Sequence, residues 1–481
     1  MTWRLVFDRF RLVAFKLLVR SATITGAYGV LAWLCGRYVE QVVCGVKRPL
    51  DSKPIPRDVT TVLVLDYERF RGDIDIFSGV PDIRILVVSW NLLRSLLRSF
   101  VMLPSDSEVA QLPKDTTARI EFHRAGTRTA RQRERYRVFL RHFLPKFFGG
   151  LNIDIVMNSD FRYRREVDLV RIASECGYGH ICYYREALYI VPAHYTLAVQ
   201  RHRAFAPFYG DLIAVQNDVT KRMFLESGIS TPDRIRVRGC PRMDGFAENI
   251  SVAQANAKEH KKQIAYFSCP RGAQLEDIRT FDFFSTTQQV VRALFELAKD
   301  DPDLHVVVKM KDMHISLQLD EMRQELHRIA GSEKGLPNVE FETGRMAAHE
   351  VIRQSDIVCA MQSTTVLEAA IAGKPVILPH FKEMREREGA EQVLMYREYY
   401  ELFDVPDNPE HLKAIILDRL SRPEIKPVVM NSRKALFEEH VSPLNGGATQ
   451  KSLDMIRETA RRRRLVRMPE VARAQVVVSE A

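Results

Sequence analysis

The sequence predicts an α/β protein built from two doubly wound domains, with a cleft between them and a helical segment at the amino terminus. Unbroken apolar runs alternate with amphipathic stretches, which is typical of parallel sheets that helices cover on both faces. The alternation occurs twice, before and after a polar stretch at residues 247–262. Because 481 residues are sufficient for two domains, we expect two Rossmann-like units, each with its ligand site at the carboxyl ends of its strands.

The predicted elements alternate along the chain. In the first domain we expect strands at residues 62–66, 83–89, 153–158, 181–184, 212–216 and 235–237, and helices at 164–176 and 219–227. In the second domain we expect strands at residues 263–268, 305–309, 339–341, 356–360 and 375–378, and helices at 286–298, 319–329, 347–354 and 365–372. The strand runs are short and apolar, whereas apolar residues recur at helical spacing in the longer stretches.

These elements divide the chain into five segments. We expect a helical segment at 1–47, the first domain at 48–246, a linker at 247–262, the second domain at 263–440, and a carboxy-terminal helix with a basic tail at 441–481. The tail, basic from Arg461 onward, is expected to fray and to contact a membrane weakly.

The amino-terminal segment mixes basic and bulky apolar residues. Residues 1–20 carry five basic side chains, and residues 21–36 carry no charge. Sixteen uncharged residues are fewer than the roughly 20 that a spanning helix needs, and a signal-peptide exit is lacking. The composition favours a helix that lies in the membrane interface. A helix packed on the protein's own surface and a true span are the alternatives.

Residues 104–150 are rich in arginine and lysine and end in four phenylalanines, Phe139, Phe143, Phe147 and Phe148. We expect an exposed basic helix or loop that ends on an apolar anchor. The alternative is an ordinary helix with one charged face.

The overall charge and the cysteines limit the class of protein. A net charge of +10 favours an anionic partner, and without an aromatic-basic module nucleic acid is not expected. The seven cysteines lie far apart and include no Cys-x-x-Cys pair. This pattern predicts reduced, buried thiols in the cytoplasm and argues against a structural zinc site.

A hydroxyl-rich turn between two apolar runs is the most informative motif. Ser363, Thr364 and Thr365 precede a short helix, and Glu368 follows one turn later. Such a turn offers backbone N–H groups and hydroxyls to phosphate, and the carboxylate could reach a ribose. The alternative is a capped helix whose glutamate faces solvent.

Three motifs together resemble a known group. Residues 363–377 read Ser-Thr-Thr-x-x-Glu-Ala-x-x-x-Gly-Lys-Pro-Val-Ile, and residues 239–244 read Gly-x-Pro-Arg-x-Asp. A third piece, residues 162–186, ends in an Arg-Glu pair. This order is similar to that of GT-B glycosyltransferases, closest to the CDP-glycerol glycerophosphotransferase and surface-polysaccharide transferase branch. The resemblance covers about residues 150–450 and implies an acceptor in the first domain and a nucleotide-activated donor in the second.

Four more residues are candidates for the donor site. Arg242 could contact phosphate, Arg271 could clamp the diphosphate, and Gly272 lets backbone approach it. Lys309 ends a predicted strand, where relatives carry Lys-x-His-Pro. This chain lacks the His-Pro, so Lys311 or His314 are possible substitutes. A structural turn at Arg242 and a solvent-exposed Arg271 are the alternatives.

A catalytic base should come from the first domain. Glu186 is the first candidate and His194 the second, because both follow a predicted strand end. We expect no cofactor and no metal, because Arg, Lys and backbone dipoles can neutralise a leaving diphosphate.

The resemblance thus implies an enzyme that transfers a sugar or polyol-phosphate from a nucleotide-activated donor to a surface-glycan or lipid-linked acceptor. It would work in the cytoplasm, peripherally at the inner face of the cell membrane, on an anionic surface. A non-hydrolysing sugar-nucleotide epimerase is one alternative. A non-catalytic nucleotide- or anion-binding scaffold with the same fold is another.

Overall fold

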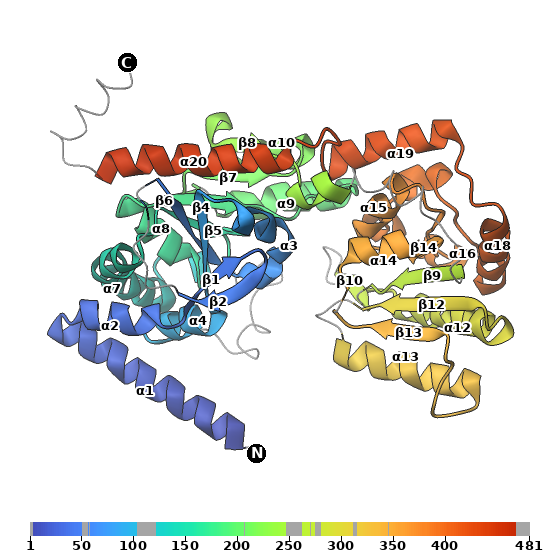
Figure 1. The fold of residues 1–481 in the computed structure, drawn as a ribbon, viewed down its shortest axis with the longest axis horizontal. Helices are drawn as coiled ribbons and strands as arrows, with labels where there is room; N and C mark the ends of the chain where they lie inside the picture. Colours follow the sequence, from blue (N-terminus) through green and yellow to red (C-terminus); the bar gives the residue numbers. More distant parts are fainter. Residues whose placement is uncertain are drawn as a thin grey trace. The chain divides into compact units, whose positions relative to one another are not determined.

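The computed structural model describes residues 3–50, 56, 58–102, 122–205, 207–246, 262–269, 271–274, 280–310, 315–344 and 346–467 (Figure 1). The chain forms two compact units. The first comprises Met1–Ala187, Val199–Arg242 and Gly447–Ala481; the second comprises Leu188–Ala198 and Met243–Gly446. Of the predicted linker, residues 247–261 lie outside the described residues. The predicted cleft between the domains stays a prediction.

The first unit contains an eight-stranded sheet in the order β2-β1-β4-β3-β5-β6-β7-β8. Its parallel strands are β3 (Thr60–Leu65), β4 (Ile83–Val88), β5 (Ile155–Asn158), β6 (Gly179–Tyr183), β7 (Leu212–Val215) and β8 (Ile235–Val237). All residues of β3, β5, β6 and β7 are buried, as expected for a sheet covered on both faces. Six predicted strands are therefore confirmed.

The edge of this sheet corrects the predicted helical segment at 1–47. Helices α1 (Trp3–Thr25) and α2 (Tyr28–Gly36) are present, but β1 (Val39–Val43) and β2 (Val46–Pro49) form an antiparallel hairpin. Cys44 and Gly45 both have positive φ, as a two-residue hairpin turn requires. Strand β1 then pairs antiparallel with β4 and joins the sheet. Among the described residues, no helix has the length and apolarity needed to cross a membrane.

The arginine-rich stretch forms a helix with one buried apolar face and one charged face, as the alternative predicted; Arg128, Arg131, Arg135 and Arg141 are exposed. Helix α7 (Arg128–Leu151) buries its phenylalanines, and Phe139, Phe143 and Phe147 stack at successive centroid distances of 5.2 Å. Arg133 is also buried and forms a bidentate pair with Asp168 of α8 (Val167–Glu175), at 2.7 and 2.8 Å. The apolar anchor is confirmed. The stretch from 103 to 121 lies outside the described residues.

The basic carboxy-terminal helix belongs to the first unit and is ordered through residue 467. Helix α20 (Ala448–Arg467) packs on β5 and β6. Arg464 donates to Asp154 at 2.8 Å, and Arg463 donates to Asp211 at 2.9 Å. The expectation of a frayed end beginning at Arg461 is therefore wrong, because carboxylates of the first unit fix this helix.

The second unit contains a parallel sheet in the order β13-β12-β9-β14-β15. The strands are β9 (Lys262–Phe267), β12 (Leu304–Lys309), β13 (Val339–Glu342), β14 (Ile357–Ala360) and β15 (Val376–Ile377). The helices include α12 (Phe284–Asp300), α13 (Ile315–Ala330), α14 (Ala348–Gln354), α15 (Thr365–Ile371), α18 (Pro409–Ser421) and α19 (Pro427–His440). Strands β10 (Gly272–Gln274) and β11 (Thr280–Asp282) form a separate antiparallel pair. The predicted α/β class with two Rossmann-like units is confirmed.

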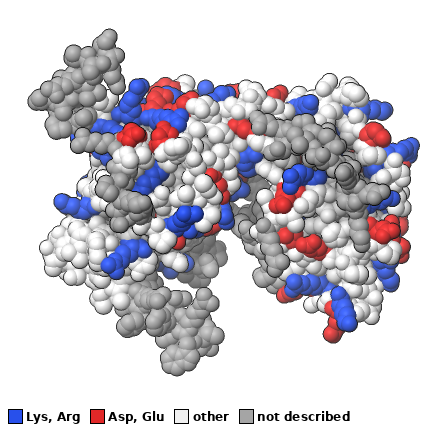
Figure 2. Space-filling view, in the orientation of Figure 1, with Lys and Arg blue, Asp and Glu red and all other residues white. Residues whose placement is uncertain are grey.

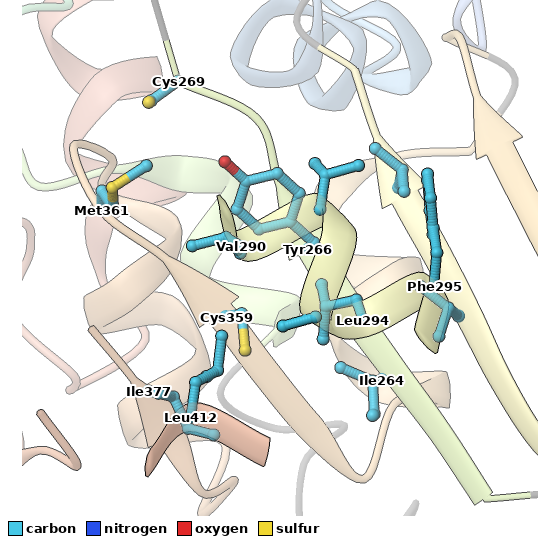
Figure 3. Packing of buried hydrophobic residues seen from close by; sticks show 14 of the residues in the cluster. Ile264, Tyr266, Cys269, Val290, Leu294, Phe295, Cys359, Met361, Ile377 and Leu412 are labelled. Carbon is cyan, nitrogen blue, oxygen red and sulfur yellow. The ribbon is translucent and has the colours of Figure 1, made fainter. Parts of the chain in front are cut away.

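The core of the second unit joins the sheet to α12 and α18. Tyr266 and Cys359 come from adjacent strands, Leu294 from α12 and Leu412 from α18, and all four are fully buried (Figure 3). Because this packing fixes β9 against β14, it also fixes the loops that leave the carboxyl ends of these strands.

Candidate functional site

The strand order of the second unit indicates where a ligand would bind. Counting along the chain, the order is 3-2-1-4-5, so it reverses between β9 and β14. In doubly wound sheets ligands bind outside the carboxyl ends of the strands at this switch point. The hydroxyl-rich turn leaves β14 at that position, immediately after Ala360.

The turn and the carboxylate that follows it form one hydrogen-bonded group. Thr364 directly precedes α15 and makes no side-chain capping bond; its hydroxyl instead donates to Oε1 of Glu368 at 3.1 Å. The Ser363 hydroxyl accepts from the backbone N–H of Thr365 at 3.3 Å. Glu368 is buried, at 3% exposure, so the alternative of a solvent-facing glutamate is wrong. Because α15 has only seven residues, the side chains matter more here than the helix dipole.

A histidine that sequence reasoning missed completes this group. His349 on α14 places Nε2 3.3 Å from Oε2 of Glu368. Its ring stacks on Phe246, with centroids 4.4 Å apart and planes 20° apart. Glu368 thus has Thr364 on one oxygen and His349 on the other. A lone histidine 19 residues upstream gives no motif, and only the packing of α14 beside α15 brings it to the carboxylate.

Tyr396 holds the backbone of the turn by a hydrogen bond. Its phenol is buried and donates to the backbone carbonyl of Ser363 at 2.6 Å. Burial, with the charge of Glu368 as a second cause, raises the pKa of Tyr396 well above its ordinary value. The phenol therefore stays protonated and remains a donor, which holds the Ser363 carbonyl in place.

The predicted phosphate-binding cations of the second unit each face a carboxylate. Lys309 ends β12, is half-buried and places Nζ 3.8 Å from the buried Glu342. Arg271 forms an ion pair with Glu321, lies 4.2 Å above the Phe284 ring and is 45% exposed. Lys309 is at a strand end, as predicted, whereas Arg271 lies in the connection between β9 and β10. A diphosphate would have to displace or share the carboxylate partners of both.

For Gly272, Lys311 and His314 the structure gives no contact that tests the predicted role. Gly272 begins β10, where its backbone pairs with Asp282. Lys311 and His314 lie outside the described residues. The side chain of Thr365 is buried, and its hydroxyl has no hydrogen-bond partner among the residues that the structure describes.

Arg242 has a structural partner in the first unit. Its guanidinium lies 3.2 Å from Asp73, which is almost fully buried. Burial opposes ionisation of this carboxyl, but Arg242 and the nearby Arg238 overcome that effect and lower the pKa of Asp73. The arrangement favours the alternative of a structural junction over a phosphate contact.

The predicted bases are placed as follows. Glu186 is exposed on the segment after β6, and His194 is half-buried in the first turn of α9 (Pro192–Arg203). They belong to different units. Their catalytic roles stay predictions.

The first unit has its own switch point, between β3 and β5, where a charged cluster collects. Asp66 follows β3 with a left-handed φ of 58°, and Arg165 lies 2.8 Å from its carboxylate. Arg165 also approaches Glu166 at 3.1 Å and covers the Trp90 ring at 3.2 Å. Burial, opposed by Arg165 and reinforced by Asp66, raises the pKa of Glu166 to about 8. This cluster gave no recognisable sequence signal.

Carboxylates that could suggest a metal have other partners. Asp-x-Asp sequences occur at 73–75 and 301–303. Asp73 pairs with Arg242, and Asp75 accepts from Arg71 at 3.2 Å. Asp301 accepts from the backbone of Asp303 in a turn. Within the described part of the chain, three or more metal-ligating side chains do not gather at any point.

One protein family matches part of the chain. Residues 285–381 match the family described as "Putative glycosyltransferase (DUF6716)". The matched segment includes α12, the turn after β14 and Glu368. It therefore confirms, over this segment, the resemblance to glycosyltransferases that the turn and its glutamate predict. No curated protein matches the chain significantly.

Several solved structures are similar at low identity. A UDP-GlcNAc 2-epimerase from Neisseria meningitidis is 12% identical over 83% of this chain and 100% of its own, with a TM-score of 0.44. A glycosyltransferase from Rickettsia africae is 13% identical over 84% and 99%, with a TM-score of 0.42. The wall teichoic acid polymerase TagF is 13% identical over 94% and 98%, with a TM-score of 0.44. Because these TM-scores lie below 0.5, the fold assignment depends on this chain's own strand order.

Proposed function

We propose that this protein is a GT-B-type transferase that binds a nucleotide-activated donor at the switch point of its second unit. The transferred group is a sugar or a polyol-phosphate, and the acceptor is a surface glycan or a lipid-linked saccharide. The observation that carries the proposal is the group formed by Thr364, Glu368 and His349. A buried carboxylate between a hydroxyl and an imidazole fixes two polar side chains at the place where such folds bind ligands.

The group suggests a division of roles. Ser363 and Thr364 are half-exposed and would hydrogen-bond a phosphate or the ribose. Glu368 is too buried to be the first contact; it would orient the Thr364 hydroxyl and the His349 ring. Because the Thr364 hydroxyl donates its proton to Glu368, it would accept from a ribose hydroxyl, and Nδ1 of His349 would offer a second polar contact to the ligand. Arg271 would exchange Glu321 for the diphosphate and neutralise the leaving group.

The first unit would hold the acceptor. Glu186 is the proposed base and His194 the alternative, and deprotonation of an acceptor hydroxyl requires one of them within hydrogen-bond reach. The basic helix α1 and the apolar helix α2 would keep the enzyme at the cytoplasmic face of an anionic membrane. The rate enhancement would come from positioning and from stabilising the leaving phosphate.

The first test is a ligand screen. CDP-, UDP-, GDP- and CMP-linked donors are added one at a time and the melting temperature is measured, because a ligand that binds only the folded state raises it. We expect one nucleotide class to raise the melting temperature and the others to leave it unchanged. Failure of all four classes contradicts the proposal.

Product analysis then separates the alternatives. The responding donor is incubated with and without membrane glycan fractions, and products are identified by mass spectrometry and NMR. Transfer that needs the acceptor supports the transferase. A C2-epimerised donor formed without acceptor supports the epimerase instead, and nucleotide binding without turnover across donors and acceptors supports the scaffold.

A further inference from the structure

The amino-terminal helices of the first unit leave an unusually apolar surface. Of the fourteen large apolar side chains that are exposed among the described residues, seven lie between Leu17 and Val46. Ile24 is 85% exposed, Val30 62% and Trp33 61%. In Figure 2 the surface at the left, over α2 (compare Figure 1), is largely free of charged side chains. Such patches on soluble domains mark interaction sites.

A groove of about 620 Å³ lies beside this patch. It is bounded by α2, by the β1–β2 hairpin and by the carboxy-terminal turns of α7. Its apolar lining includes Ala32, Trp33, Leu50, Phe147 and Leu151. The groove is therefore mainly apolar, and Trp33 on one of its walls is itself exposed.

Glycines in the helices keep this groove open. Gly29 and Gly36 on α2 and Gly150 on α7 all line it. None has a positive φ, and a Cβ added to any of them would meet no atom within 4 Å. Glycine destabilises a helix relative to alanine. At these three positions neither a positive φ nor a crowded Cβ position requires glycine. The absent Cβ atoms at these three positions leave room for an external molecule to approach the helix backbone.

The charge at the groove specifies the occupant. Arg37 and Lys146 line it opposite a single carboxylate, Glu40, and Arg37 stacks on Trp33 at 4.2 Å. From residue 9 to residue 39 the sequence contains basic residues and no acidic one. An aromatic side chain with an adjacent cation suits the depth at which lipid headgroups lie.

We propose that this groove binds one acyl chain of an acidic phospholipid, with the headgroup phosphate between Arg37 and Lys146. This inference rests on the proposed location of the enzyme at an anionic membrane and adds to it a defined lipid site. The apolar patch around Ile24 and Val30 contacts the bilayer, and the chain in the groove anchors the first unit to a single lipid.

The test uses one substitution placed at two neighbouring positions. Gly150→Leu fills the groove, whereas Gly149→Leu makes the same change on α7 at a residue that does not line it. Both positions have open space at Cβ, so both variants are expected to fold. Trp3→Phe and Trp90→Phe in the full chain leave Trp33 as the only tryptophan. Its quenching by chain-brominated phosphatidylglycerol in phosphatidylcholine vesicles reports a lipid chain in the groove.

We expect Trp33 quenching and vesicle binding with phosphatidylglycerol, and little of either with phosphatidylcholine alone. Gly150→Leu is expected to weaken binding about tenfold, as displacement of roughly two buried methylene groups predicts, and Gly149→Leu is expected to behave like the parent. Equal binding by the two leucine variants overturns the lipid site. Dimerisation without vesicles that only Gly150→Leu abolishes assigns the groove to a second copy and also overturns it.

The proposed function is separated from this site by a second measurement. Nucleotide binding by the second unit is followed in the same variants by the shift in melting temperature. A parent protein that binds nucleotide but no phosphatidylglycerol vesicle overturns the lipid site and the membrane location while leaving the donor site standing. A parent protein that binds phosphatidylglycerol vesicles but shows no shift in melting temperature with any nucleotide overturns the donor site and leaves the lipid site standing.

Discussion

Removing the Tyr396 hydroxyl, which holds the Ser363 carbonyl, should lower both the stability of the second unit and its affinity for nucleotide. Tyr396→Phe deletes the hydroxyl that lies 2.6 Å from the Ser363 carbonyl oxygen and leaves the aromatic ring in place. A neutral hydrogen bond contributes about 1 kcal/mol, and an unpaired buried acceptor costs about 1–3 kcal/mol more. Ser363 is half-buried, so water can replace part of the loss. We therefore expect the unfolding free energy of the second unit to fall by about 1–2 kcal/mol.

The same change should weaken nucleotide binding. Without this hydrogen bond the turn samples other positions, and the ligand must order it again on binding. If that ordering costs about 1 kcal/mol, affinity falls about fivefold, because 1.4 kcal/mol corresponds to a factor of ten. Urea denaturation measures the first effect, and isothermal titration calorimetry with the responding nucleotide measures the second.

Tyr400→Phe is the matched control. The Tyr400 hydroxyl lies 2.9 Å from Nδ1 of the buried His380, whereas the hydroxyl that bonds the Ser363 carbonyl is that of Tyr396. This variant should lose similar stability yet keep the parent's nucleotide affinity. Equal loss of affinity in both variants would refute the reasoning, since it would show that the effect comes from general destabilisation.

Three further predictions concern the fold and the predicted cations. Asp168→Ala should lower the unfolding free energy in urea by about 3–5 kcal/mol, because Arg133 would remain charged and buried, whereas the exposed Glu134→Ala should cost less than about 1 kcal/mol; equal losses would contradict this. The pKa of Glu166 in the folded protein is about 8, above its unfolded value of 4.5, so its contribution to stability is complete below about pH 4.5 and is lost as pH rises through 8. Urea denaturation at a series of pH values should show the unfolding free energy falling over this range. The fall should be absent in Glu166→Gln. Arg271→Ala and Lys309→Ala should each lower the affinity for a nucleoside diphosphate severalfold in calorimetry and leave the affinity for the bare nucleoside unchanged. Equal loss of affinity for both ligands would show that these residues do not bind the phosphates.

The strands and helices were predictable because their signal is local. Each buried strand of the two sheets is an unbroken apolar run, and the helices that were predicted have a 3.6-residue pattern. Helices α9, α18 and α19, in which this pattern is weak, were not predicted. The β1–β2 hairpin escaped prediction because β2 reads Val-Lys-Arg-Pro and is wholly exposed. It depends on a two-residue turn and on an edge of the sheet that is distant in sequence.

The errors at charged residues have a common cause, which is a partner far along the chain. Arg133 looks like a surface residue until Asp168, 35 positions away, supplies its carboxylate. The arginines of α20 look like a loose tail until Asp154, some 310 positions upstream, binds them. Composition predicts charge, but only the tertiary fold decides whether a charge is paired and buried.

The candidate site was predictable in part for the same reason. Thr364 and Glu368 are four residues apart on one helical turn, so their hydrogen bond follows from local spacing. His349 and Tyr396 lie on other elements, and neither belongs to a recognisable motif. Glu368 was placed correctly beside the hydroxyls, but its burial could not be foreseen from the turn alone.

Calorimetry of one variant pair tests the central claim most directly. Glu368→Gln keeps the size of the side chain but removes the charge between Thr364 and His349, and Glu350→Gln makes the same change on the neighbouring helix α14. We predict that Glu368→Gln lowers affinity for the responding nucleotide at least tenfold, since hydrogen bonds to a charged group are worth about 1.5–3 kcal/mol, and that Glu350→Gln retains it. Undiminished affinity in a folded Glu368→Gln protein would contradict the assignment of the donor site.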